Sequence, residues 1–70
     1  MFLKKRSFSL SRHRTSVALE DEFWDILAAE AHAAGKSLAA LVAEVDAARG
    51  MRPLASALRL HALAAARRAP

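Results

Sequence analysis

The fold is decided by residues 14–24, which read Arg-Thr-Ser-Val-Ala-Leu-Glu-Asp-Glu-Phe-Trp. The first six residues contain neither Gly nor Pro and are rich in residue types that favour extended structure, so we predict a strand over Arg14–Leu19. Acidic side chains follow at once, and the positive end of a helix dipole favours negative charge. A helix is therefore predicted to begin near Glu20 or Asp21.

The apolar residues before this strand follow the opposite alternation. Phe8 and Leu10 occupy even positions, whereas Val17 and Leu19 occupy odd positions. Side chains two residues apart share one face of a strand, so a single continuous strand cannot bury all four on the same side. We expect the earlier segment to be separate from the strand or joined to it through a bulge.

Three helices are predicted after the strand, because apolar residues recur at helical spacing. The first ends at Gly35, since glycine readily adopts the left-handed conformation that stops a helix. The second starts at Ser37, a residue type that caps helix N-termini, and ends at Gly50 ahead of Pro53. The third spans about Leu54–Arg67.

The chain is short and has few ways to stabilise a core. It has 70 residues and no cysteine, and 18 of the residues are alanine, which buries little area. A core of this size stabilises a lone chain poorly. The three histidines are far apart and lack the spacing of metal ligands. We therefore predict a homodimer with a shared core.

The sequence contains no signature of an enzyme. With two glycines in the chain, it has no phosphate-binding loop, nucleophile elbow or dinucleotide fingerprint. We predict that the protein is not an enzyme and uses no catalytic residue, metal or cofactor.

Charge is segregated along the chain. Residues 1–19 carry five basic side chains and no acid, residues 20–50 have a net charge of −5, and residues 51–70 have +4. We predict that residues 1–13 form a basic, partly flexible arm. Such an arm favours a polyanionic partner, nucleic acid before membrane, although a solubilising disordered tail would have the same composition.

The sequence predicts neither a membrane segment nor a secretory signal. It has no apolar run of about 18 residues, and the N-terminus lacks the continuous apolar stretch of a signal peptide. Its Arg- and Ser-rich, acid-free start loosely resembles an organellar transit peptide. A cytoplasmic location is the prediction, and an organellar one is the alternative.

The order of these elements resembles the ribbon-helix-helix superfamily of bacterial DNA-binding proteins. The similarity covers residues 14–49: the strand Arg14–Leu19, the helix opened by Glu20-Asp21-Glu22-Phe23-Trp24, and the junction Gly35-Lys36-Ser37-Leu38. The stretch Lys5-Arg6-Ser7 followed by His13-Arg14-Thr15-Ser16-Val17 is similar to a compact bacterial subfamily.

The resemblance implies a mainly α fold with one short strand. Two chains would pair their strands into an intermolecular antiparallel β-ribbon and form an intertwined homodimer. Residues 14–50 would be the ribbon-helix-helix domain, and residues 51–70 a C-terminal helix packing on the dimer. The ribbon would enter the major groove of double-stranded DNA, with base contacts from Arg14, Ser16 and Ala18. Because Ala18 is shorter than the polar side chains usual there, we expect modest sequence selectivity.

The same resemblance implies a set of phosphate contacts, which we expect from Lys4, Lys5, Arg6, Arg12, Lys36 and Ser37. Ser37 belongs to this set because the first amides of a helix bind anions. His13 is expected before the paired strand, with a phosphate contact as its alternative role. Trp24 is interpreted as a packing residue rather than a dimer cap or an exposed contact.

These features predict a dimeric DNA-binding protein that regulates transcription. The alternative is a protein-interaction module, such as an antitoxin-like or adaptor subunit. In that case the fold would serve dimerisation, and the third helix would bind a protein partner.

Overall fold

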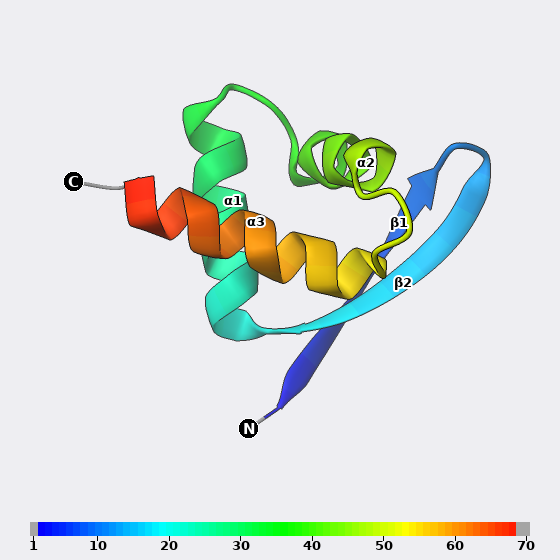
Figure 1. Cartoon of the computed structure of the whole chain (residues 1–70), viewed down its shortest axis with the longest axis horizontal. Coiled ribbons are helices and arrows are strands. Elements are labelled where there is room, and N and C mark those ends of the chain that lie inside the picture. The colour runs from blue at the N-terminus through cyan, green and yellow to red at the C-terminus, as the bar shows by residue number, and fades with distance from the viewer. Residues whose placement is uncertain (1, 69–70) are drawn as a thin grey trace.

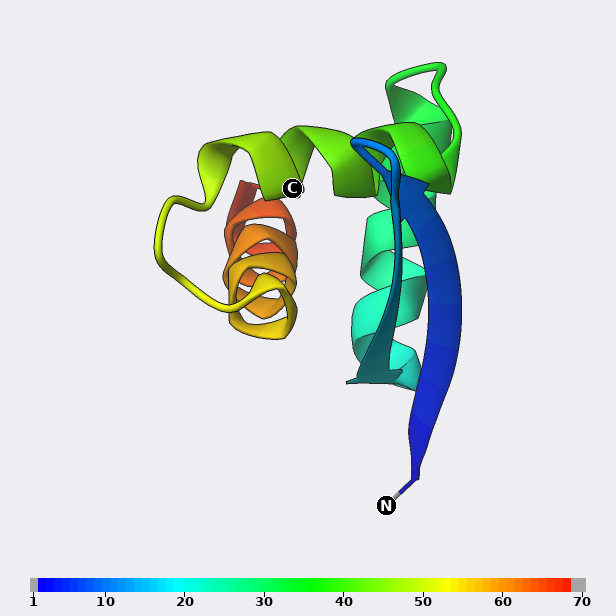
Figure 2. The same ribbon diagram turned by 90° about the vertical axis from the view of Figure 1, so that its right-hand side faces the viewer.

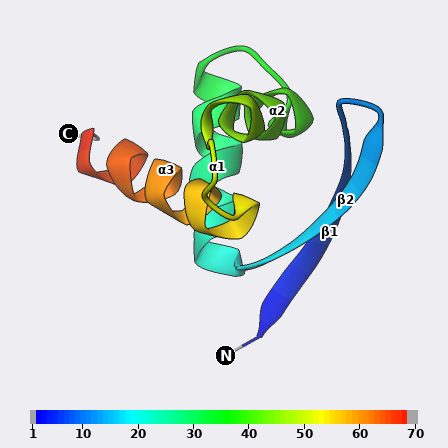
Figure 3. The ribbon, with the colours of Figure 1, turned by 45° about the vertical axis from the view of Figure 1, so that its right-hand side comes forward.

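The computed structural model describes residues 2–68. Two strands precede three helices (Figure 1): β1 (Leu3–Leu10), β2 (His13–Glu20), α1 (Asp21–Ala33), α2 (Leu38–Ala48) and α3 (Leu54–Arg68). The strands form one antiparallel hairpin, and the three helices lie together on one side of it (Figure 3). This arrangement leaves the other side of the hairpin uncovered by helices.

The expectation of one short strand per chain is wrong. Residues assigned to a flexible arm form β1, which pairs with β2 in an unbroken register from Leu3↔Glu20 to Leu10↔His13. The turn between the strands consists of Ser11 and Arg12, with φ of 47° and 73°. Two successive left-handed residues make the turn that matches the twist of a tight hairpin. The strand pairing therefore closes within one chain and needs no bulge.

The register also explains the opposite alternation of the apolar residues. Cross-strand partners share a face of the sheet, and Phe8 lies opposite Thr15 while Arg6 lies opposite Val17. The even residues of β1 and the odd residues of β2 thus point the same way. All four apolar side chains, Phe8, Leu10, Val17 and Leu19, are buried on this face.

The core lies between this face and the helices. It contains Phe8, Leu10, Val17, Leu19, Trp24, Leu27, Ala31, Leu41, Val42, Val45, Ala57, Leu58 and Ala62. Trp24 is 2% exposed, so its predicted packing role is confirmed. Its indole Nε1 donates a hydrogen bond of 2.8 Å to the carbonyl oxygen of Lys4. The first helix is therefore tied directly to the first strand.

The predicted helix boundaries are confirmed at the junction of α1 and α2. Gly35 follows α1 with φ of 71°, the left-handed conformation that favours glycine. Ser37 is the N-cap of α2, and its Oγ accepts a hydrogen bond of 3.0 Å from the backbone N–H of Ala40. Arg67 and Arg68 lie in the last turn of α3, where the helix dipole favours positive charge.

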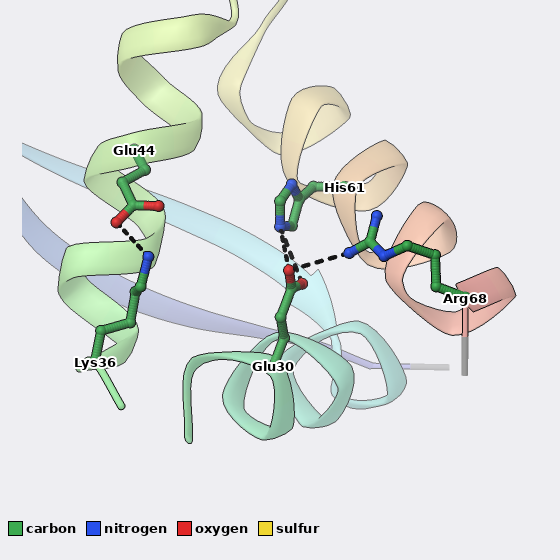
Figure 4. Close-up of polar contacts among 5 residues, drawn as sticks. All are labelled: Glu30, Lys36, Glu44, His61 and Arg68. Carbon is green, nitrogen blue, oxygen red and sulfur yellow. Dashed lines mark hydrogen bonds and ion pairs between the residues drawn. The ribbon is translucent and has the colours of Figure 1, made fainter. Parts of the chain in front are cut away.

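Polar contacts fasten α3 to α1 and β2. His61 Nε2 lies 3.0 Å from both carboxylate oxygens of Glu30, and Arg68 donates to the same carboxylate at 3.4 Å (Figure 4). Arg59 reaches Glu20, at the end of β2, at 3.0 Å. α3 thus packs on its own chain at both ends of α1.

Among the described residues, no single helix has the length and apolar character needed to cross a membrane. α1 and α2 together have that length and apolar character, but the chain bends by 102° between the two helices.

Candidate nucleic-acid interface

The side of the hairpin opposite the core carries a continuous row of mostly polar side chains. The register pairs Lys5 with Ala18, Ser7 with Ser16 and Ser9 with Arg14, and we call these six residues the outer face. Ser7 Oγ and Ser16 Oγ are hydrogen-bonded at 2.9 Å. All six are exposed except Ala18, which is half-buried. The outer face is thus free to meet a partner while the opposite face holds the core.

The three predicted base-contacting residues lie together on this face. Arg14, Ser16 and Ala18 occupy alternate positions of β2 and therefore project from the same side. β1 adds Ser7 and Ser9 beside them, which were not predicted from the sequence, and Lys5 was not predicted to lie on this face. The signal was present in the alternation of polar residues at positions 5, 7 and 9 with the apolar Phe8 and Leu10.

The predicted phosphate contacts do not gather on one surface. Lys4 and Arg6 project from the core side of β1, where Lys4 Nζ lies 3.9 Å from Asp21 Oδ1. The guanidinium of Arg6 lies 5.5 Å from the centre of the Trp24 ring, a cation–π distance. Lys5 is on the outer face, and Arg12 is exposed in the turn. The basic arm of the sequence is thus split between the two faces and the tip of the hairpin.

Lys36 and Ser37 lie at the start of α2. α2 contacts β1, and Figure 2 shows it at the level of the hairpin's tip. The ammonium of Lys36, which precedes the helix, pairs with the carboxylate of Glu44 on α2 (Figure 4). The first amides of an α-helix lack partners within the helix, so the start of α2 offers hydrogen-bond donors.

The prediction that His13 lies before the paired strand is wrong. It is the first residue of β2, opposite Leu10, because the turn is only two residues long. Its side chain is exposed, so the cost of burying an imidazole does not arise. Thr15, which shares its face, is half-buried.

A second surface feature is an open groove of about 630 Å³ between α2 and α3. Its lining mixes charged and apolar side chains: Glu44, Val45, Ala48, Arg49, Arg52, Ala57, Leu60 and His61. Within residues 2–68, no three His, Asp or Glu side chains converge as a metal site would require.

A family model described as a ribbon-helix-helix domain matches residues 3–66. The chain belongs to the ribbon-helix-helix family. The match covers both strands and most of α3, so it extends well beyond the residues on which the resemblance rested. No curated protein and no solved structure matches the chain significantly. Ribbon-helix-helix domains are commonly DNA-binding transcription regulators or antitoxins, generally act on DNA as dimers, and are typically non-enzymatic.

In this ribbon-helix-helix protein the outer face is electrostatically simple. It carries two cations, Lys5 and Arg14, one near each end. The next pair on the same side of the sheet is Leu3 and Glu20, and the Glu20 carboxylate lies 3.0 Å from the guanidinium of Arg59. Within the described part of the chain, no carboxylate lies within 4.0 Å of either cation. Both charges are therefore available to an external anion or a hydrogen-bond acceptor.

Proposed function

We propose that this ribbon-helix-helix protein is a homodimeric DNA-binding regulator of transcription in the bacterial cytoplasm, which inserts its hairpin into the major groove of double-stranded DNA. The observation that carries the proposal is the division of the hairpin into a buried apolar face and an exposed polar, basic face. A two-stranded ribbon fits the major groove. The outer face can meet DNA without disturbing the core.

The base contacts in this proposal come from β2. Arg14 can donate two hydrogen bonds to guanine O6 and N7, and Ser16 can donate or accept. Ala18 offers only a methyl group, which suits the methyl group of thymine. The exposure of Arg14 and Ser16 supports these roles.

The phosphate contacts in this proposal are spread over both faces of β1, the tip of the hairpin and the start of α2: Lys4, Lys5, Arg6, Arg12, Lys36 and Ser37. Exposed Arg12 supports an anion contact at the tip of the hairpin, and the first amides of α2 support another at the start of that helix. Such contacts position a protein on DNA without specifying a sequence.

The dimer in this proposal is intertwined through strand exchange. Neither Ser11 nor Arg12 is a glycine, yet both are left-handed, which costs about 1–2 kcal/mol per residue. Strained short turns invite exchange of identical elements between chains. If the turn opened, β1 of each chain could pair with β2 of the other in the same register. The result would be an intermolecular ribbon of β1 with β2, whereas the sequence-based prediction paired residues 14–19 of one chain with the same residues of the other.

Anisotropy of a labelled random-sequence duplex, titrated with the protein over a salt series, tests the DNA-binding proposal. We expect log K to fall linearly with log salt, with a slope of about −0.9 per phosphate contact. Arg12→Ala should flatten the slope by about one contact per subunit, or two per dimer. Arg67→Ala removes the same charge at the end of α3 that points away from the hairpin (Figure 3), and it should leave the slope unchanged. Absence of binding at low salt would exclude the proposal.

The groove between α2 and α3 favours a second candidate function, that of a protein-interaction subunit. Arg52 lies beside Val45 and Leu60 in this groove, together with Glu44 and with Arg49, whose guanidinium is paired with Asp46 at 2.7 Å. A segment with an apolar side chain and an acid for Arg52 would fit this lining. Met51, at the edge of the same region, is fully exposed. This candidate takes over if the chain folds and dimerises but does not bind DNA.

A further inference from the structure

The basic triplet Lys4-Lys5-Arg6 is divided by the alternation of β1. Lys4 lies near Asp21, and Arg6 lies over the ring of Trp24. Both therefore have partners within the chain, on the core side of the hairpin. Lys5 projects from the other side and lies opposite Ala18. Three adjacent cations of one sequence motif are thus in different environments.

Lys5 has an open approach to any molecule that meets the outer face. Its cross-strand neighbour is the short side chain of Ala18, and its next neighbour on the same strand and face is Ser7. Neither side chain is long enough to cover a lysine, which extends through four methylene groups. On its other side lie Leu3, which is exposed, and Glu20, whose carboxylate is paired with Arg59. The Lys5 ammonium therefore reaches beyond its surroundings, as Arg14 does beside Ser9.

Lys5 and Arg14 stand at a defined separation. Arg14 lies opposite Ser9, four residues along β1 from Lys5. With a rise of about 3.4 Å per residue, the two positions are about 14 Å apart along the hairpin. Base pairs are stacked about 3.4 Å apart along the DNA axis, so this length corresponds to roughly three to four base pairs. Between the two cations lie only the paired hydroxyls of Ser7 and Ser16.

We propose that Lys5 reads a base of the major groove instead of making the phosphate contact assigned to it above. Lys5 and Arg14 together would recognise two guanines about three to four base pairs apart. The inference rests on the proposed DNA-binding function and deepens it. Lysine, like arginine, can donate to guanine O6 and N7. Lys5 is thereby distinguished from Lys4 and Arg6, whose positions suit phosphate contacts or packing.

The test begins with duplexes selected by the wild-type protein from a random-sequence library. Affinity is then measured for each single base-pair change, using wild type, Lys5→Gln, Lys5→Arg and Lys4→Gln. We expect Lys5→Gln to lose discrimination of about 5- to 150-fold at one guanine. Lys5→Arg should retain it, because arginine makes the same contact. Lys4→Gln, the adjacent change of equal charge, should weaken all duplexes alike.

A second arm tests the separation of the two contacts. Insertion of one base pair between the two selected guanines should weaken binding by as much as loss of one guanine. Circular dichroism establishes that each variant is folded. Unchanged base preference in Lys5→Gln would overturn this inference while leaving the DNA-binding proposal intact. Absence of wild-type binding to any duplex at low salt would overturn both.

Discussion

At the scale of single residues, Ser37 connects a local hydrogen bond to the geometry of the junction between two helices. Its Oγ accepts from the backbone N–H of Ala40 at 3.0 Å, so one of the unpaired amides at the start of α2 is satisfied. Ser37→Ala should lower the free energy of unfolding by about 1 kcal/mol. Urea denaturation measures the loss. Ser37→Asp, which supplies another capping oxygen, should restore most of it, and equal stability of all three proteins would contradict the capping role.

Glu20 gives the protein a specific sensitivity to acid. A hydrogen bond from its own backbone N–H and the nearby Arg59 guanidinium hold the pKa of Glu20 below its ordinary value of 4.5, against the opposing effect of burial. Because the folded-state pKa is lowered, the charged carboxylate stabilises the fold above about pH 4.5. That contribution disappears as the pH falls through the lowered pKa.

Glu20→Gln should therefore destabilise the protein at pH 7 and have a smaller effect at pH 3. The measurement is urea denaturation at both pH values. Glu22→Gln is the matched control, because Glu22 is an exposed acid in the first turn of the same helix. If Glu20→Gln and Glu22→Gln showed the same pH dependence, the pairing of Glu20 with Arg59 would be irrelevant to stability.

At the scale of elements, the turn of the hairpin carries backbone strain, because two residues other than glycine have positive φ. Arg12 adopts φ of 73°, a conformation that glycine tolerates without strain. Arg12→Gly should raise the free energy of unfolding by about 0.5–1 kcal/mol, after allowance for the greater freedom of glycine in the unfolded chain. Arg12→Ala removes the same charge without relieving the backbone, so it should give no gain. Thermal denaturation of the two variants decides the point, and a stabilised Arg12→Ala would assign the effect to charge.

The same turn shows why the sequence predicted the helices better than the strands. Gly35 and Ser37 end and begin helices by well-understood local preferences, and the structure confirms both. Ser11 and Arg12 lack the Asn-Gly pattern that marks a tight hairpin, so nothing local revealed the turn. The opposite alternation of Phe8 and Val17 was the non-local signal, and it is explained only when the two segments pair.

Part of the candidate site could likewise be predicted from local sequence, and part could not. Arg14, Ser16 and Ala18 could be placed on one face from alternation alone, which is a property of any strand. The separation of Lys5 from Lys4 and Arg6 could not, because it depends on β1 being a strand and on the position of Trp24. Which of these residues touch DNA stays a prediction.

At the scale of the whole molecule, the hairpin lets one chain bury its own core. In the proposed exchange, the same β1–β2 residue pairs would form between two chains. If the wild-type protein exchanges strands, its melting temperature should rise with protein concentration. The combined change Ser11→Asn with Arg12→Gly favours the closed turn and should shift the protein toward monomer in sedimentation analysis. A wild-type protein that stays monomeric at all concentrations would exclude the intertwined dimer.

The hydroxyl pair at the centre of the outer face affects how strictly the DNA sequence of a target site is specified. Ser7 and Ser16 face each other at 2.9 Å, and either oxygen can be the donor. Each hydroxyl hydrogen can rotate toward its partner or toward a base, so the pair suits a donor and an acceptor equally. A ribbon that binds DNA with this face would require particular base pairs at two positions of the target site and would accept several base pairs between them. The aligned target sites would then show a conserved letter at each end and near-random letters between them.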